Sequence, residues 1–324
     1  MANNIPVSAQ IPPAELMTAV ALQSGNSVSK DFTNLAEALT ARFGDSLDAV
    51  LLYGSCLHSC SLDDGIADLY VVVDNYRHAY SKRHLALLNA WLAPNVFYLE
   101  VPSQERTLRA KYAVISMADF EQGARHWFHP YIWARFAQPS RLLYVRNESS
   151  RQHIHKILAY AVITFLKTSA AALDNSCEVN VEEIWTHGLT LTYAAELRPE
   201  KKTRARYLVQ RNLDDYTQLT TAARPALSAI LEALPNGHYH CLVSAAERRR
   251  AARRWRLRRW QGRILSILRL TKATITFRDC LDYAAWKIER HTGIQVEITP
   301  MLRRHPVLWG YKIMWQLIRR GVLR

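Results

Sequence analysis

Two apolar segments separated by a polar loop place the strongest constraint on how this chain can fold. Residues 48–53 predict a strand that ends at Gly54-Ser55, and residues 67–73 (ADLYVVV) predict a buried central strand because they are β-branched and nearly continuous. A glycine at a strand end lets the backbone approach a phosphate, and the serine after it offers an N–H and a hydroxyl. Asp68 opens the second strand, where a buried carboxylate needs a cation. The alternative is a buried strand pair with an ordinary turn.

A Gly-Ser turn followed by an acid on the neighbouring strand resembles the layout of the nucleotidyltransferase superfamily. There the turn cradles a nucleoside triphosphate and the acid holds Mg²⁺ against it. The superfamily pattern has a second acid two residues after the first, and Tyr70 occupies that position here. Asp74 lies on the same strand face as Asp68, but six residues of strand span about 20 Å, so the two carboxylates cannot share one ion. Either Glu100 on a third strand supplies a second ligand, or the metal relies on substrate phosphates and water while Glu100 faces solvent.

The remaining pattern predicts an α/β (α+β) protein with a nucleotidyltransferase-type mixed sheet and flanking helices. Further strands are expected at 95–101 (ended by Pro102), 111–116, 141–145 and 273–277. Helices are expected at 31–42, 80–91, 119–137, 153–173, 182–197, 205–222, 226–234 and 281–290. We therefore predict a loose N-terminal arm around one short helix (1–30), a nucleotidyltransferase domain (31–148), a mostly helical second domain (149–245) and a basic amphipathic C-terminal region (246–324).

A wider set of motifs resembles the mitochondrial-type phosphatidate cytidylyltransferase family, which has bacterial members. The motifs follow the family's order between residues 45 and 290: Tyr53-Gly54-Ser55, Asp68 to Asp74, His78-Ala79-Tyr80-Ser81, Lys111 to Ser116, Ala134 to Pro139, Glu200-Lys201-Lys202, Tyr207-Leu208-Val209, Tyr216, and then Lys272, Thr276, Tyr283 and Lys287. The chain departs from the family at Cys56, Ala113 and Gln138, where the family has Gly, Gly and Lys.

The resemblance implies a Mg²⁺-dependent enzyme that transfers CMP from CTP to phosphatidic acid, giving CDP-diacylglycerol and pyrophosphate. We expect Asp68 to bind the metal, with Glu100 as the candidate second ligand. Lys111 should stabilise charge on the phosphates, which makes Asp68 and Lys111 the candidate catalytic residues. Gly54 and Ser55 should cradle the β- and γ-phosphates. Asp74 should support the strand end or contact the base.

The charge balance indicates an anionic partner. The chain has 42 Lys and Arg against 28 Asp and Glu, and nine arginines fall within the sixteen residues 248–263. This run predicts a solvated helix face, a nucleic-acid-binding helix, or an interfacial helix whose Trp255 and Ile264 enter a lipid head-group layer. Residues 306–324 repeat the basic and aromatic pattern. Two such segments near one end favour a membrane surface over plain solvation. We expect an anionic membrane surface as the partner and do not expect nucleic acid.

The sequence also predicts where the protein acts. The longest apolar run, residues 157–166, has ten residues, and a membrane span needs about 20, so no transmembrane helix is expected. Five scattered cysteines without a CxxC pair are typical of reduced thiols in a cytoplasm. We expect a peripheral protein on the inner face of the cell membrane, or on the matrix face of the mitochondrial inner membrane in a eukaryote. The rival hypothesis is an RNA-directed nucleotidyltransferase, or a nucleic-acid-binding module whose catalytic pair has decayed at Tyr70.

Overall fold

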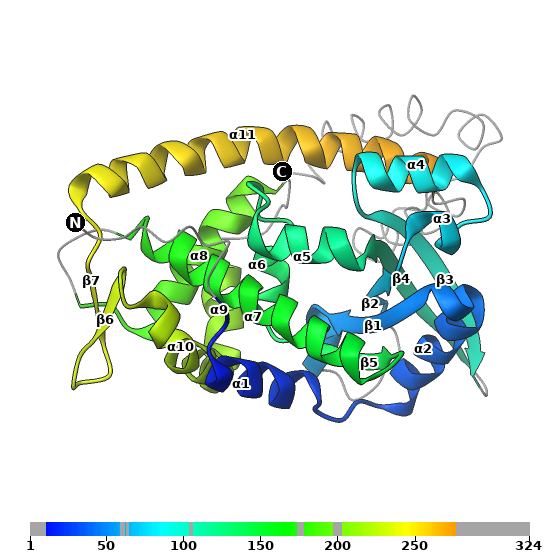
Figure 1. Cartoon of the computed structure of the whole chain (residues 1–324), viewed down its shortest axis with the longest axis horizontal. Coiled ribbons are helices and arrows are strands. Elements are labelled where there is room, and N and C mark those ends of the chain that lie inside the picture. The colour runs from blue at the N-terminus through cyan, green and yellow to red at the C-terminus, as the bar shows by residue number, and fades with distance from the viewer. Residues whose placement is uncertain are drawn as a thin grey trace.

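A five-stranded mixed sheet forms one end of the protein. The computed structural model describes residues 11–58, 62, 65–103, 106–173, 178–196 and 203–276. The strands are β1 (Leu47–Tyr53), β2 (Ala67–Val73), β3 (Asn95–Ser103), β4 (Arg106–Ser116) and β5 (Arg141–Val145). They lie in the order β3-β4-β2-β1-β5, and only the β2–β4 pair is parallel (Figure 1). The predicted mixed sheet with flanking helices is confirmed.

The strand limits follow from each strand's place in the sheet. β2 and β5 match their predicted ranges, and β1 begins one residue earlier than predicted. β3 continues past Pro102 because it is an edge strand, where the missing N–H of proline faces no partner strand. β4 begins at Arg106 rather than at Lys111, because its first residues pair with the end of β3.

Helices cover both faces of the sheet. Helix α2 (Lys30–Phe43) covers one face, where Phe43 packs edge-on against Tyr112 of β4. On the other face, Tyr70 of β2 packs edge-on against Phe136 of α6 (Trp133–Phe136). Side chains alternate between the faces along each strand, so Asp68 lies on the α6 face together with Tyr70.

The helices around the sheet depart from the predicted limits at two places. The predicted helix 80–91 is α4 (Arg83–Trp91), preceded by the short α3 (Tyr76–Ala79). The predicted helix 119–137 is α5 (Met117–Arg125) and α6, because residues 126–132, which include Pro130, interrupt it.

A helical part follows the sheet. Its helices are α7 (Glu148–Ala170), α8 (Val181–Ala195), α9 (Thr203–Arg211) and α10 (Leu213–Leu227). The short helix predicted in the N-terminal arm is α1 (Ala14–Ser24). It is not loose, because it buries Leu16 and Val20 against the helical part. The predicted helix 226–234 is wrong, because α10 ends at Leu227 and a hairpin of β6 (Leu231–Ala233) and β7 (Tyr239–Cys241) follows.

Helix α11 (Ala245–Thr276) runs along the top of the molecule in Figure 1 and joins the helical part to the sheet. Gly262 lets it cross α8 closely, since a Cβ at this position would lie 1.9 Å from the Ala195 carbonyl oxygen. At the sheet end, the ammonium group of Lys272 donates hydrogen bonds to the carbonyl oxygens of Leu92 and Pro94.

The arginine run is therefore part of a structural helix. The prediction that Trp255 faces a membrane is wrong, because its ring is buried beside Trp133 and its Nε1 donates to the Thr168 carbonyl. The strand predicted at 273–277 is also wrong over 273–276, which belong to α11. The predictions for 281–290 and 306–324 lie outside the described residues. Within the described ranges, no helix has the length and apolar character needed to cross a bilayer.

Candidate functional site

Three of the predicted site residues, Gly54, Asp68 and Lys111, lie together at the N-terminal end of the central strand β2. Asp68 and Lys111 are register partners on the parallel strands β2 and β4, and the Lys111 Nζ lies 3.2 Å from the Asp68 Oδ1. Gly54 directly follows β1 with φ +86°, and a Cβ added there would lie 3.3 Å from the Asp68 Oδ2. Glycine thus leaves the turn able to adopt a left-handed conformation and keeps the approach to the Asp68 carboxylate open.

Ser55 follows Gly54 as the first residue of the 3₁₀ helix η3 (Ser55–His58). The structure places its backbone at the predicted turn. Its side chain is outside the described atoms, so the predicted hydroxyl contact stays a prediction.

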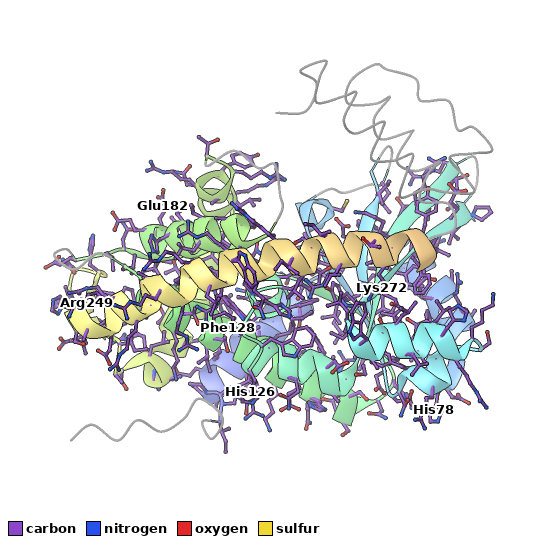
Figure 2. The ribbon with its side chains drawn as sticks, turned by 90° about the horizontal axis from the view of Figure 1, so that it is seen from above. His78, His126, Phe128, Glu182, Arg249 and Lys272 are labelled. Carbon is purple, nitrogen blue, oxygen red and sulfur yellow. The ribbon has the colours of Figure 1, made fainter. Side chains whose placement is uncertain are left out.

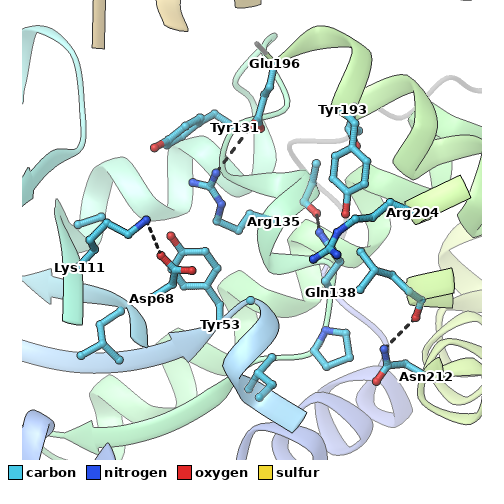
Figure 3. Close-up of a pocket in the computed structure, with 18 of the residues that line it drawn as sticks. Tyr53, Asp68, Lys111, Tyr131, Arg135, Gln138, Tyr193, Glu196, Arg204 and Asn212 are labelled. Atoms are coloured by element: carbon cyan, nitrogen blue, oxygen red, sulfur yellow. Dashed lines mark hydrogen bonds and ion pairs between the residues drawn. The ribbon is translucent and has the colours of Figure 1, made fainter. Parts of the chain in front are cut away.

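These residues open into a cavity of about 580 Å³ between the sheet and the helical part. Asp68, Lys111 and Gly54 line the sheet side, and Tyr193, Glu196, Arg204 and Asn212 from α8 to α10 line the opposite side. Arg135 lies between the two sides (Figure 3). Among the described lining residues, Lys111, Arg135 and Arg204 outnumber the two carboxylates of Asp68 and Glu196, so this part of the lining favours an anionic ligand.

A cage of tyrosines holds Arg135 in place. Its Nη1 donates to the Tyr70 hydroxyl over 2.9 Å, and its Nη2 lies 3.6 Å from the Glu196 Oε2. The guanidinium lies 4.2 Å from the ring centroid of Tyr131 and 5.3 Å from that of Tyr53. The cage leaves only 10% of the Arg135 side chain exposed, which fixes its charge at the cavity wall.

Tyr131 is also in contact with a second guanidinium. Arg269 of α11 lies 3.9 Å from the Tyr131 ring centroid. Burial by itself would raise the pKa of the Tyr131 hydroxyl, but Arg135 and Arg269 lower it below its ordinary value. For Tyr70, burial is the largest influence and raises the pKa well above its ordinary value, so this phenol remains protonated.

Asp74 and Glu100 do not join the predicted site. Asp74 is at the opposite end of β2, where its Oδ2 lies 2.9 Å from the His78 Nδ1. Glu100 shares a sheet face with Lys111 but lies two residues further along the edge, where it pairs with Arg109 at 3.1 Å and is 50% exposed. The geometry therefore favours the solvent-facing alternative for Glu100 and does not support a nucleotide contact for Asp74.

The residues present fit a Mg²⁺ ion held mainly by its substrate. In the part of the chain that the structure describes, no group of three His, Cys, Asp or Glu side chains could hold a metal. Mg²⁺ usually keeps several waters and binds one or two carboxylates plus substrate phosphates. The Asp68 carboxylate is 28% exposed, faces the cavity and has an open approach past Gly54, so it can supply such a ligand.

Sequence reasoning gave no role in the site to Arg135, Tyr131, Glu196 and Arg204, although Arg135 belongs to the motif Ala134 to Pro139. A signal existed for Arg135, because an arginine within the apolar turn Trp133–Phe136 must find buried partners. The other three reach the cavity only through helix packing, and no local pattern marks them.

Comparisons with known proteins add no assignment to this site. No protein-family model matches the chain, and the search of curated proteins finds no match.

Proposed function

We propose that this protein is a nucleotidyltransferase that transfers CMP from CTP to phosphatidic acid, forming CDP-diacylglycerol and releasing pyrophosphate. The observation that carries the proposal is the meeting of Gly54, Asp68 and Lys111 on the sheet side of a cavity of about 580 Å³. A glycine turn, a carboxylate and a lysine are groups that can together hold the phosphates of a nucleoside triphosphate and its Mg²⁺. The choice of cytosine and of the lipid acceptor rests on the motif resemblance.

The reaction needs positioning and charge neutralisation more than acid–base chemistry. An oxygen of the acceptor's phosphate monoester attacks the α-phosphorus of CTP, and the bond from the α-phosphorus to the β-phosphate oxygen breaks. A phosphate monoester has a second pKa of about 6, so the attacking oxygen is already ionised at neutral pH. No side chain has to remove a proton.

Two positively charged side chains of the cavity, Lys111 and Arg135, neutralise the charge of the phosphates. Lys111 sits at the sheet side, beside the carboxylate of Asp68, and neutralises phosphate charge there. Arg135 supplies a second, immobilised positive charge between the sheet side and the helical side of the cavity (Figure 3). Asp68 would hold the Mg²⁺, which when bound neutralises the triphosphate further.

The test compares two aspartates of the same strand. Asp68→Asn keeps the shape of the side chain and removes its charge, so CTP-dependent activity should fall by at least about 100-fold. Asp74→Asn makes the same chemical change at the opposite end of β2 and should keep near-normal activity. Activity is measured as transfer of label from CTP to lipid with phosphatidic acid micelles and Mg²⁺, and thermal melts check that both variants are folded.

Near-normal turnover by a folded Asp68→Asn variant would remove Asp68 from the site and contradict the proposal. Transfer of label to RNA in place of phosphatidic acid would support the rival, RNA-directed activity.

A further inference from the structure

Helix α11 carries an apolar row that the described part of the chain leaves largely exposed. Leu257, Trp260, Ile264 and Ile267 recur at helical spacing and are 54%, 65%, 38% and 49% exposed. The side of α11 that holds the helix to the molecule carries Trp255, Arg258 and Lys272, which are 2%, 6% and 4% exposed. The exposed row therefore contributes little to the fold.

Arginines surround this row. Seven of the nine arginines in residues 248–263 are exposed, namely Arg249, Arg250, Arg253, Arg254, Arg256, Arg259 and Arg263. Glu247 is the one acidic residue in the sequence of α11, and its carboxylate accepts hydrogen bonds from the backbone N–H and hydroxyl of Ser244. The charge of this surface is therefore almost entirely positive.

A cationic cavity of about 420 Å³ adjoins the same helix. Arg250, Arg254, Arg258 and Lys167 line it, and Glu247 is the one carboxylate among its described lining residues. The guanidinium of Arg258 lies 4.6 Å from the ring centroid of Phe128, which Figure 2 shows beside α11. Burial, and then the neighbouring Arg254, lower the pKa of Arg258 to about 10, and burial also lowers that of Lys167. Cations that have lost water in this way gain most from an anionic ligand.

The apolar row and the cavity lie on adjoining sides of α11. The cavity residues Arg250, Arg254 and Arg258 follow one another at intervals of four, and Leu257 stands seven residues, or about two helical turns, after Arg250. An occupant that reaches both must offer phosphate groups next to an apolar layer. A bilayer containing anionic phospholipid has this composition, whereas nucleic acid offers phosphates with bases that stack singly on aromatic rings.

We propose that α11 is the membrane-docking element of this protein, with Leu257, Trp260, Ile264 and Ile267 inserted at the head-group boundary and a lipid phosphate held by the cavity of Arg250, Arg254, Arg258 and Lys167. The inference deepens the proposed function, since it rests on a lipid surface as the place of reaction, and it names the face that meets that surface.

The experiment measures co-sedimentation of the full chain with vesicles of phosphatidylcholine alone and of equal parts phosphatidylcholine and phosphatidylglycerol. Phosphatidylglycerol is not the proposed acceptor, so binding is read independently of the catalytic cavity. The wild-type protein should bind the anionic vesicles and not the neutral ones. Leu257→Glu should lower binding at least about tenfold, because it replaces an apolar contact with a like charge to the membrane.

A matched control tests whether the effect is specific to the apolar row, and a second variant tests the contribution of the arginine-lined cavity to vesicle binding. Leu22→Glu makes the same change at a 60% exposed leucine on α1, which lies on the opposite side of the molecule in Figure 1, and should bind like the wild type. Arg254→Gln should weaken binding and reduce its dependence on salt, because one phosphate contact is lost. Thermal melts check that each variant is folded.

Equal binding by folded Leu257→Glu and Leu22→Glu variants would overturn the proposal. RNA binding in the absence of vesicle binding would also overturn it, as would a dimer that Leu257→Glu dissociates. If the Asp68→Asn variant lacks transfer activity but binds vesicles normally, docking stands with the proposed function. If the wild type binds vesicles and has no transfer activity, docking stands and the proposed function fails.

Discussion

Tyr70 occupies the strand position at which the nucleotidyltransferase pattern has a second acid. In this structure Tyr70 helps to hold Arg135 in place. Its buried hydroxyl accepts a hydrogen bond from Arg135 over 2.9 Å. A permanently charged guanidinium thus lies where a second metal-binding carboxylate would otherwise point. The departure from the pattern is consistent with one metal ligand at Asp68 and with a fixed positive charge from the protein.

A side chain at position 54 would affect both the backbone turn and the approach to the Asp68 carboxylate. Gly54→Ala should lower CTP affinity about tenfold, or ~1.4 kcal/mol, because the new methyl group crowds the Asp68 carboxylate at 3.3 Å. It should also lose about 1–2 kcal/mol of stability, because φ is +86°.

Gly237→Ala is the matched control for this change. Its φ is +80° and a Cβ there meets nothing within 4 Å, so it should lose similar stability and leave CTP binding unchanged. Calorimetric titration with CTP, alongside thermal melts, checks both variants. Normal CTP affinity in Gly54→Ala would show that the turn does not approach the nucleotide.

At the scale of elements, the sequence pattern of α11 predicts a helix but does not determine which of its faces is buried. The arginine run predicted a helix, and the helix exists, but the pattern did not show which tryptophan faces inward. Trp255 is buried against Trp133, while Trp260 is 65% exposed. Because both faces of α11 carry arginines and tryptophans, the choice depends on contacts that only the packed chain provides, here with Trp133 of α6 and Thr168 of α7.

The sheet was more predictable than the helices around it. Residues 67–73 and 141–145 are strands with the predicted limits. For 67–73 the reason is a nearly continuous apolar segment, ending in three valines, in a buried central strand, which has few alternatives. The split at Asn212 between α9 and α10, and the hairpin β6–β7 in place of a helix, escaped prediction. These short segments take their conformation from tertiary contacts.

The crossing of α8 and α11 depends on Gly262. Gly262→Ala should destabilise the protein by roughly 1–3 kcal/mol or more, because the new Cβ would lie 1.9 Å from a backbone carbonyl that cannot rotate away. Ala252→Gly, at an exposed position of the same helix, should cost only about 0.5–1 kcal/mol through helix propensity. Urea unfolding measures both, and equal losses would mean that the two helices do not cross at Gly262.

At the scale of the whole molecule, the fold brings residues that are far apart in the sequence together around the candidate site. The strand register brings Gly54, Asp68 and Lys111 together, so these three could be predicted from the sequence. Glu196 and Arg204 come from helices more than a hundred residues after Asp68 and reach the cavity because α8 and α9 pack opposite the sheet. Such residues cannot be found without the fold.

Folding stability should depend on pH through a buried histidine. Burial, and then the charge of Arg269, lower the pKa of His129 to about 3, against about 6.5 in the unfolded chain. The unfolded state therefore binds the extra proton first as pH falls. The contribution of His129 to stability is complete above about pH 6.5 and is lost toward pH 3, by up to about 1.4 kcal/mol per pH unit.

His129→Gln should flatten this acid dependence. Urea unfolding of both proteins at a series of pH values from neutral to acidic checks the difference between them. Parallel curves would show that His129 titrates normally in the folded protein.

The most direct test of the proposed transfer of CMP to phosphatidic acid follows the α- and γ-phosphates of CTP separately. The protein is incubated with Mg²⁺, phosphatidic acid and CTP that carries radioactive phosphorus at either the α- or the γ-phosphate. The account predicts that the α-label enters the lipid fraction, that the γ-label appears in pyrophosphate, and that both require phosphatidic acid. Label from the γ-phosphate in the lipid, or no lipid label from a folded wild-type protein that binds CTP, would contradict it.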